Sequence, residues 1–213
     1  DNTILIIDDV RSHDYGEYSW NLHPSGQSSK NGIDIEINNG SNKVKIRPLY
    51  PEYLTESDFE HDFPDHLKLK TKLGPIAKEE GREIYYTVTD PHKRNNCKFI
   101  TAIMLPDSSG NLDEAMQIDC NDGCGVRIIS GDKTTDVFLN NRADGHIMHR
   151  NSCNTFGEFD SDAYILAYSY PSDKTKPSKD DILRWFVAYG SYVRVPDEKT
   201  SCFDSFTKQT KIW

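Results

Sequence analysis

Histidines are the residues of this 213-residue chain best suited to chemistry, and two of its seven lie in one short stretch, HDYGEYSWNLHP (13–24). An imidazole near neutral pH can move a proton, bind a metal ion or contact a ligand. The stretch alternates like a β-strand, which places three apolar side chains on one face: Tyr18, Trp20 and Leu22. We therefore expect Trp20 to be buried in a sandwich core and His23 to lie on the opposite face. There His23 is either an edge residue before the turn-forming Pro24 or a ligand-binding residue.

Two other histidine groups have a spacing that a metal ion could use. His146 and His149 in HIMH lie three positions apart, but such residues point to opposite sides of a strand. The motif also lacks the intervening glutamate of helical zinc-protease sites. The stretch HDFPDH (61–66) could hold a divalent ion on a loop, although acidic loops of this kind are more often only solvated. The sequence therefore predicts no metal site and no cofactor.

The odd number of cysteines leaves at least one thiol without a partner inside the chain. The five cysteines are Cys97, Cys120, Cys124, Cys153 and Cys202. Cys120 and Cys124 flank NDG, a tight-turn signal, so a hairpin would place them roughly opposite each other. Two interpretations remain open for this pair: a cross-strand disulfide, or two small buried thiols.

The charge of the chain excludes several partners. The net charge is −9 and the pI is near 5.2, which opposes binding to nucleic acids and anionic membranes. The same field opposes sulfated or uronic glycans unless basic residues cluster locally. No apolar run is long enough to span a bilayer. Phosphate-binding glycine loops and a nucleophile elbow are also absent from the sequence. The chain begins at Asp1, so we expect a mature secreted protein or a fragment of a longer one.

Alternation with a period of two residues dominates the chain and indicates strands. The clearest hairpin joins GIDIEI (32–37) to KVKIRPL (43–49). Residues 51–82 are polar and rich in proline, so they read as a long excursion with one short strand. The only helix candidate is SKDDILRW (178–185), which is short enough to be a single turn. Further strands are expected at 3–10, 17–23, 83–89, 97–106, 115–120, 125–130, 135–141, 163–171 and 184–195.

These elements predict an all-β fold with little helix. About ten to twelve short strands at regular spacing are typical of an antiparallel β-sandwich, of the jelly-roll or supersandwich-like kind. No internal repeat and no linker rich in glycine, serine or proline divides the chain. We therefore predict a single β-sandwich domain over residues 1–213.

The order of the strands resembles that of a known family. The segments that carry the resemblance are ILIIDDVRSHDYGEYSWNLHP, KVKIRPLYP, KFITAIMLP, DAYILAYSY and RWFVAYGSYVRV. Together they are similar to the C-terminal sheet region of heparinase II/III-like polysaccharide lyases, where a strand ending in aspartate precedes a strand of the form Trp-x-x-His. The resemblance spans most of the chain, and the order and spacing of the segments carry it.

The resemblance implies a glycan-cleaving reaction by β-elimination. In that family a base removes the proton at C5 of a uronic acid, a tyrosine or histidine protonates the leaving oxygen, and the C4–O bond breaks. Most catalytic residues lie on an N-terminal α/α-toroid, and a structural zinc is often present. This chain has no long amphipathic helices for a toroid, and its segment DNT (1–3) has Asp1 where the family motif has histidine. The resemblance therefore assigns no catalytic or zinc-binding residue here.

Three functions follow from these observations. The first is a C-terminal sandwich domain of a secreted or periplasmic lyase, inactive alone, that supports a site on a missing toroid; glycosaminoglycans are then the expected substrates. The second is a free-standing carbohydrate-binding module, for which His23 is the candidate contact. The third is a complete small jelly-roll enzyme, but no convergent set of carboxylates or histidines is visible. The expected partners are a polysaccharide or the toroid domain.

Overall fold

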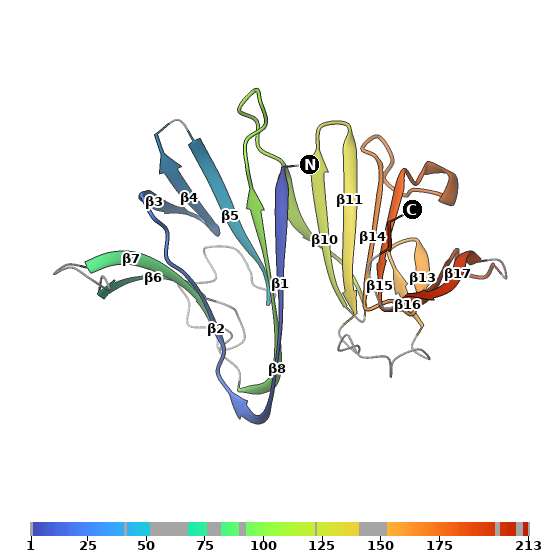
Figure 1. Ribbon diagram of the computed structural model, residues 1–213, viewed down its shortest axis with the longest axis horizontal. Coiled ribbons are helices and arrows are strands. Elements are labelled where there is room, and N and C mark those ends of the chain that lie inside the picture. Colours follow the sequence, from blue (N-terminus) through green and yellow to red (C-terminus); the bar gives the residue numbers. More distant parts are fainter. Residues whose placement is uncertain are drawn as a thin grey trace. The chain divides into compact units, whose positions relative to one another are not determined.

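A computed structural model of the chain describes residues 2–40, 42–51, 68–75, 82–89, 93–121, 123–140, 153–198, 201–207 and 211–212. The chain forms two compact units, Asp1–Leu112 (unit 1) and Asp113–Trp213 (unit 2). Antiparallel pairing joins the strands of every sheet (Figure 1). Among the described residues, no helix combines the length and apolar character needed to cross a bilayer.

Unit 1 contains a five-stranded and a three-stranded sheet. The larger sheet has the order β1 (Thr3–Gly16), β8 (Arg94–Met104), β5 (Asn42–Tyr50), β4 (Asp34–Asn39) and β3 (Gln27–Asn31). The smaller sheet has the order β2 (Ser19–Leu22), β7 (Arg82–Thr89) and β6 (Lys68–Pro75). The predicted hairpin is confirmed as β4 and β5, in which Ile35 lies opposite Ile46.

Side chains from both sheets build the core of unit 1. Its buried members are Ile35, Ile46, Tyr86, Val88, Cys97 and Phe99. Trp20 and Leu22 pack against this cluster, which confirms the core-facing side of β2. The prediction that Trp20 is buried is only partly right, because its side chain is half-buried. The physical reason is that β2 pairs with β7 alone among the described strands, so Trp20 lies at the edge of its sheet.

Unit 2 also contains two sheets. The six-stranded sheet has the order β18 (Lys211–Ile212), β15 (Arg184–Ala188), β14 (Ile165–Pro171), β11 (Lys133–Asn140), β10 (Gly123–Ser130) and β9 (Glu114–Ile118). The four-stranded sheet has the order β12 (Asn154–Phe156), β13 (Phe159–Ser161), β16 (Gly190–Arg194) and β17 (Ser201–Thr207).

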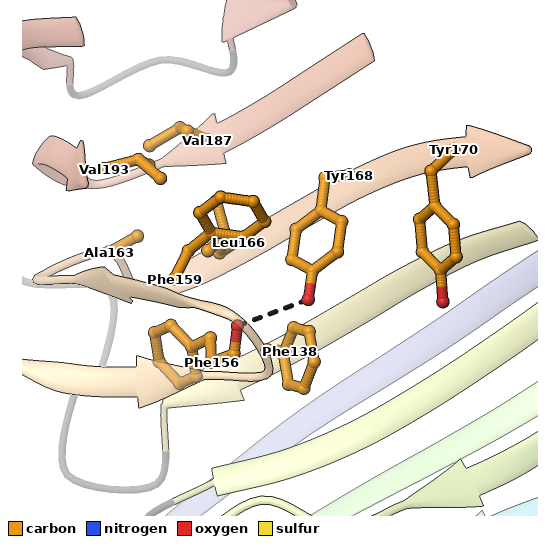
Figure 2. Close-up of a cluster of buried hydrophobic side chains, with 9 residues drawn as sticks. All are labelled: Phe138, Phe156, Phe159, Ala163, Leu166, Tyr168, Tyr170, Val187 and Val193. Atoms are coloured by element: carbon orange, nitrogen blue, oxygen red, sulfur yellow. Dashed lines mark hydrogen bonds between the residues drawn. The ribbon is translucent and has the colours of Figure 1, made fainter. Parts of the chain in front are cut away.

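Aromatic rings dominate the core of unit 2 (Figure 2). The buried cluster consists of Phe138, Phe156, Phe159, Ala163, Leu166, Tyr168, Tyr170, Val187 and Val193. The ring of Phe159 meets those of Tyr168 and Trp185 edge-to-face, with centroids 5.0 and 4.8 Å apart. The Tyr168 hydroxyl donates to the carbonyl of Phe156 at 3.3 Å. Gly157 turns the chain at φ +61°, and a Cβ there would overlap the Tyr168 hydroxyl.

The all-β, antiparallel sandwich-like fold class is confirmed, and the single domain over 1–213 stays a prediction. The helix candidate at 178–185 forms only the 3₁₀ turn η2 (Lys179–Asp181), because the following residues enter β15 and pair with β14. The described part of the chain also holds more strands than the predicted ten to twelve. Strands of two to four residues, such as β12, β13 and β18, are too short to show alternation.

Candidate functional site

A groove with a volume of about 490 Å³ opens on the surface of unit 1. It is lined by Pro24, Gly26, Gln27, Ser28, Ser29, Asn38 and Ile84. These residues come from the turn after β2, from the β3–β4 hairpin and from β7. None of the described lining side chains is charged, so the groove offers hydroxyl and amide groups together with a few apolar contacts.

The β3–β4 hairpin holds the polar side of the groove in place. Within the hairpin Gln27 lies opposite Asn38, and Ser28 lies opposite Ile37. The hydroxyl of Tyr86, a buried residue of β7, donates to Ser28 Oγ at 3.2 Å. Because Tyr86 belongs to the other sheet, this bond links the edge of the large sheet to the small one beside the groove.

His23 and Tyr85 form a stacked ring pair on the face of β2 and β7 that is opposite to the core. Their ring centroids lie 4.9 Å apart with an interplanar angle of 12°. The pairing of β2 with β7 explains the contact, because Leu22 lies opposite Tyr86 and the next residues along each strand then face each other. Neither ring lines the groove, although Pro24 directly follows His23 and Ile84 directly precedes Tyr85. His23 is exposed and Tyr85 is half-buried, so the pair offers an aromatic surface to a ligand.

The chemistry of this site favours binding over reaction. Hydroxyl and amide side chains donate and accept hydrogen bonds without changing charge near neutral pH. No described lining residue supplies the carboxylate or free imidazole that a general base requires, and His23 stacks on Tyr85 outside the lining set. In the part of the chain that the structure describes, no group of three or more His, Cys, Asp or Glu residues could hold a metal ion.

Among the described residues, the structure brings none of the predicted site residues into the lining of this groove. His23 lies on the face opposite the core, as predicted, and its role in ligand binding stays a prediction. His13 is exposed near the end of β1. The two candidate metal stretches, HDFPDH (61–66) and HIMH (146–149), lie outside the described residues.

Sequence reasoning missed most of the groove. The β3 stretch QSSKN has no apolar residue, so alternation could not identify it as a strand. Tyr85 was expected only as part of a strand, because its contact with His23 depends on a pairing between residues about sixty positions apart. One sequence signal does point to this region. The polar segment after Pro24 directly precedes the predicted hairpin (32–49), so it could pair with that hairpin as a further strand.

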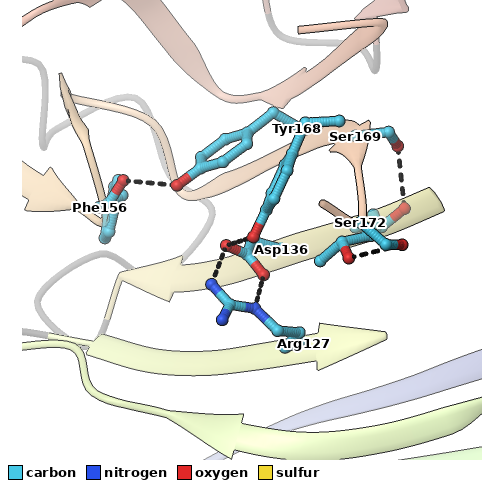
Figure 3. Close-up of polar contacts among 9 residues, drawn as sticks. Arg127, Asp136, Phe156, Tyr168, Ser169 and Ser172 are labelled. Carbon is cyan, nitrogen blue, oxygen red and sulfur yellow. Dashed lines mark hydrogen bonds and ion pairs between the residues drawn. The ribbon is translucent and has the colours of Figure 1, made fainter. Parts of the chain in front are cut away.

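A cluster of polar side chains in unit 2 holds neighbouring strands in register (Figure 3). Arg127 Nε and Nη2 donate to the two Asp136 carboxylate oxygens at 2.7 and 2.8 Å, and the Tyr170 hydroxyl donates to Oδ2 at 2.9 Å. Burial raises the pKa of Tyr170, and the nearby Asp136 carboxylate raises it further. Arg127 and Asp136 lie directly opposite each other on β10 and β11, so the cluster fixes the register of these strands.

Serine and threonine hydroxyls add further links between strands of unit 2. Thr135 Oγ1 and Ser169 Oγ lie 2.9 Å apart, and Thr134 Oγ1 donates to Ser172 Oγ at 3.1 Å. Figure 3 draws these hydroxyl contacts together with the Arg127–Asp136 pair. These bonds join β11 to β14 and to the turn that follows it, so they support the sheet and offer no reactive group.

The cysteines resolve one open alternative. Cys120 and Cys124 are thiols, so the cross-strand disulfide does not form in the structure. Cys124 is buried and Cys120 is half-buried. Cys153 is exposed, with Arg194 Nη2 3.8 Å from its sulfur.

No protein-family model matches the chain, and no curated protein matches it significantly.

Proposed function

We propose that the chain is a non-catalytic, glycan-binding β-sandwich. The observation that carries this proposal is the stacked His23–Tyr85 pair on the outer face of unit 1; the same unit also carries an uncharged groove of hydroxyl and amide side chains. Aromatic rings present a flat apolar face with a polar rim, which suits the C–H face of a sugar ring and its hydroxyls. The groove volume of about 490 Å³ also falls in the range of ligand sites, roughly 300–1,000 Å³.

A second candidate function places this sandwich within a heparinase II/III-like polysaccharide lyase. The five segments that resemble the family fall on β1–β2, β5, β8, β14 and β15–β16, in chain order. In this proposal the sandwich supports a β-elimination site on a separate toroid, in a secreted or periplasmic protein. The net charge of −9 weighs against tight binding of polyanionic glycans by this chain alone.

Affinity electrophoresis tests the binding proposal. The purified chain is run through gels containing neutral polysaccharides (β-glucan, xylan or glucomannan) or uronic ones (alginate or heparan sulfate). We expect retardation in at least one neutral gel, and weaker retardation of the His23→Ala/Tyr85→Ala double variant. Ser19→Ala is the matched control, because Ser19 is an exposed residue of β2, the strand that leads to His23, and its hydroxyl lies 2.9 Å from Thr89 Oγ1. Unretarded migration of the parent chain in every gel would overturn the proposal.

The ultraviolet absorbance of the unsaturated product tests an expectation that the two candidates share, that the chain alone does not cleave glycans. We expect none from the chain alone with alginate, heparan sulfate or hyaluronan. Steady growth of this signal, abolished by a substitution in this chain, would show that the chain carries its own catalytic residues.

A further inference from the structure

Tyr189 adopts a backbone conformation that tyrosine rarely takes. It joins β15 to β16 with φ +49°, in the left-handed region. For a bulky residue this region is a genuine outlier, whereas glycine and asparagine enter it with less strain. Its side chain is nevertheless a large ring, and 38% of the residue is exposed. The ring is thus held at the surface against the local backbone preference.

Hydrogen bonds of the residues that follow Tyr189 help to fix this conformation. Asp162, only 2% exposed, accepts bonds from the backbone N–H of Ser191 at 2.7 Å and of Tyr192 at 3.2 Å, and a short one from the Ser191 hydroxyl. Ser161 Oγ donates to the Tyr192 carbonyl at 2.7 Å. Strained residues persist where their surroundings over-determine them, and they cluster at functional sites.

Close packing leaves the turn no room to relax. A Cβ on Gly190 would lie 2.8 Å from the Ala163 Cα, so only glycine fits at position 190. The Tyr189 carbonyl accepts a bond from the Tyr164 backbone N–H at 3.1 Å. The fold therefore sets the backbone conformation of residue 189, but it does not require a tyrosine side chain there.

Tyr164 supplies a second ring. The Tyr164 and Tyr189 rings meet edge-to-face with centroids 6.4 Å apart and an interplanar angle of 76°. This distance lies near the far end of the range for aromatic pairs, roughly 4.5–7 Å, so the contact orients the Tyr189 ring while leaving much of it exposed. Together the two rings form an aromatic surface with two phenol hydroxyls.

We propose that Tyr164 and Tyr189 form a second sugar-binding platform, on unit 2, which stacks the face of a neutral pyranose. This inference rests on the proposed glycan-binding function and adds a site that is separate in sequence from the groove of unit 1. The C–H face of a pyranose is attracted by the negative face of an aromatic ring. A carboxylated or sulfated sugar is repelled by that face and by the net charge of −9.

Substitutions at position 189 separate a ligand-binding role from a structural one. Tyr189→Asn removes the ring and suits the left-handed backbone, so we expect it to melt at the same temperature as the parent or higher. Its affinity for the neutral polysaccharide that retards the parent should fall about tenfold, the loss of one good aromatic contact. Tyr189→Phe keeps the ring and the strain, and should stay close to the parent in both measurements.

The outcomes distinguish this inference from the function on which it rests. Retardation of the parent that is lost in His23→Ala/Tyr85→Ala but unchanged in Tyr189→Asn overturns the platform and leaves the groove. A Tyr189→Asn chain that melts well below the parent overturns it too, because the ring is then a structural member. If Tyr189→Asn changes self-association in sedimentation velocity but leaves the glycan affinity unchanged, the rings serve a protein contact and the platform is overturned. No retardation of the parent in any gel overturns both proposals.

Discussion

The two units build cores of different kinds from the same strand pattern. In unit 1 the described buried cluster mixes aliphatic residues such as Ile35 and Ile46 with Tyr86 and Phe99, and half-buried residues surround it. In unit 2, five of the nine buried residues of the described cluster are Phe or Tyr. An aromatic side chain buries more area than an aliphatic one and adds directional ring contacts. Alternation therefore sets which residues face inward, while side-chain size sets how fully they are buried.

The same contrast holds for one ion pair in each unit. Arg47 lies opposite Asp34 on β5 and β4, and Arg127 lies opposite Asp136 on β10 and β11. Both arginines bind both oxygens of their carboxylate, at 2.6 to 2.8 Å. The carboxylate environments differ, because the Asp34 side chain is 14% exposed and also faces Lys45, whereas that of Asp136 is 3% exposed and receives the Tyr170 hydroxyl.

The largest effect should come from emptying the core of unit 2. Phe138 is fully buried, so Phe138→Ala should lower the free energy of unfolding by about 4 kcal/mol. Trp20→Ala in unit 1 should cost about 2 kcal/mol, since a half-buried ring leaves a smaller cavity. Urea unfolding followed by circular dichroism measures both losses. Tryptophan fluorescence reports on both units, because Trp20 lies in unit 1 and Trp185 in unit 2. Equal losses in the two variants would contradict the contrast between the cores.

Removing the carboxylate of each pair tests the two ion pairs. Asp136→Ala strands both Arg127 and Tyr170, and should cost about 3 kcal/mol. Asp34→Ala leaves Arg47 and Lys45 with more access to water, and should cost about 1 kcal/mol. The same urea measurement, repeated at high salt, gives a second reading, because salt screens the more accessible pair more strongly. A larger loss in Asp34→Ala than in Asp136→Ala would show that Tyr170 adds nothing to its pair.

A smaller effect is expected in alkaline solution. Burial, with the Asp136 carboxylate next in weight, raises the pKa of Tyr168 above its ordinary value of 10.0. The folded state then keeps a proton that the unfolded chain releases. The associated stability is fully present below the unfolded pKa and is lost as the pH rises from there toward the folded pKa. We expect the free energy of unfolding to fall by about 1 kcal/mol between about pH 10 and about pH 11.

Tyr168→Phe is the control for that measurement, because it fills the same space without a titrating hydroxyl. Its unfolding free energy should fall less steeply over the same alkaline interval, while both chains show flat profiles at lower pH. Parallel alkaline slopes for the two chains would assign the loss to other groups.

The strands and their inward faces were accessible from sequence, because alternation is local. It placed Ile35 and Ile46 on one hairpin and Trp20 toward the core. The depth of Trp20 was not accessible, because edge position depends on which strands pair. The groove was mostly hidden, since β3 has no apolar residue and Tyr85 reaches His23 through a non-local register. The strain at Tyr189 could not be predicted for another reason. Nothing in the segment AYGSY (188–192) indicates that the tyrosine, and not the adjacent glycine, takes the positive φ.

The smallest effect, on the outer face of unit 1, sharpens the contrast between core and surface. His23 is exposed and makes one stacking contact, with Tyr85. His23→Ala should therefore change the free energy of unfolding by less than about 0.5 kcal/mol. Tyr85→Ala should cost more, about 1 kcal/mol, because that ring is half-buried. Urea melts of the two variants beside the parent decide the matter. A loss above about 2 kcal/mol in His23→Ala is the cost of a structural residue. His23 would then belong to the framework of β2, and the glycan-binding proposal would depend on Tyr85 and the groove alone.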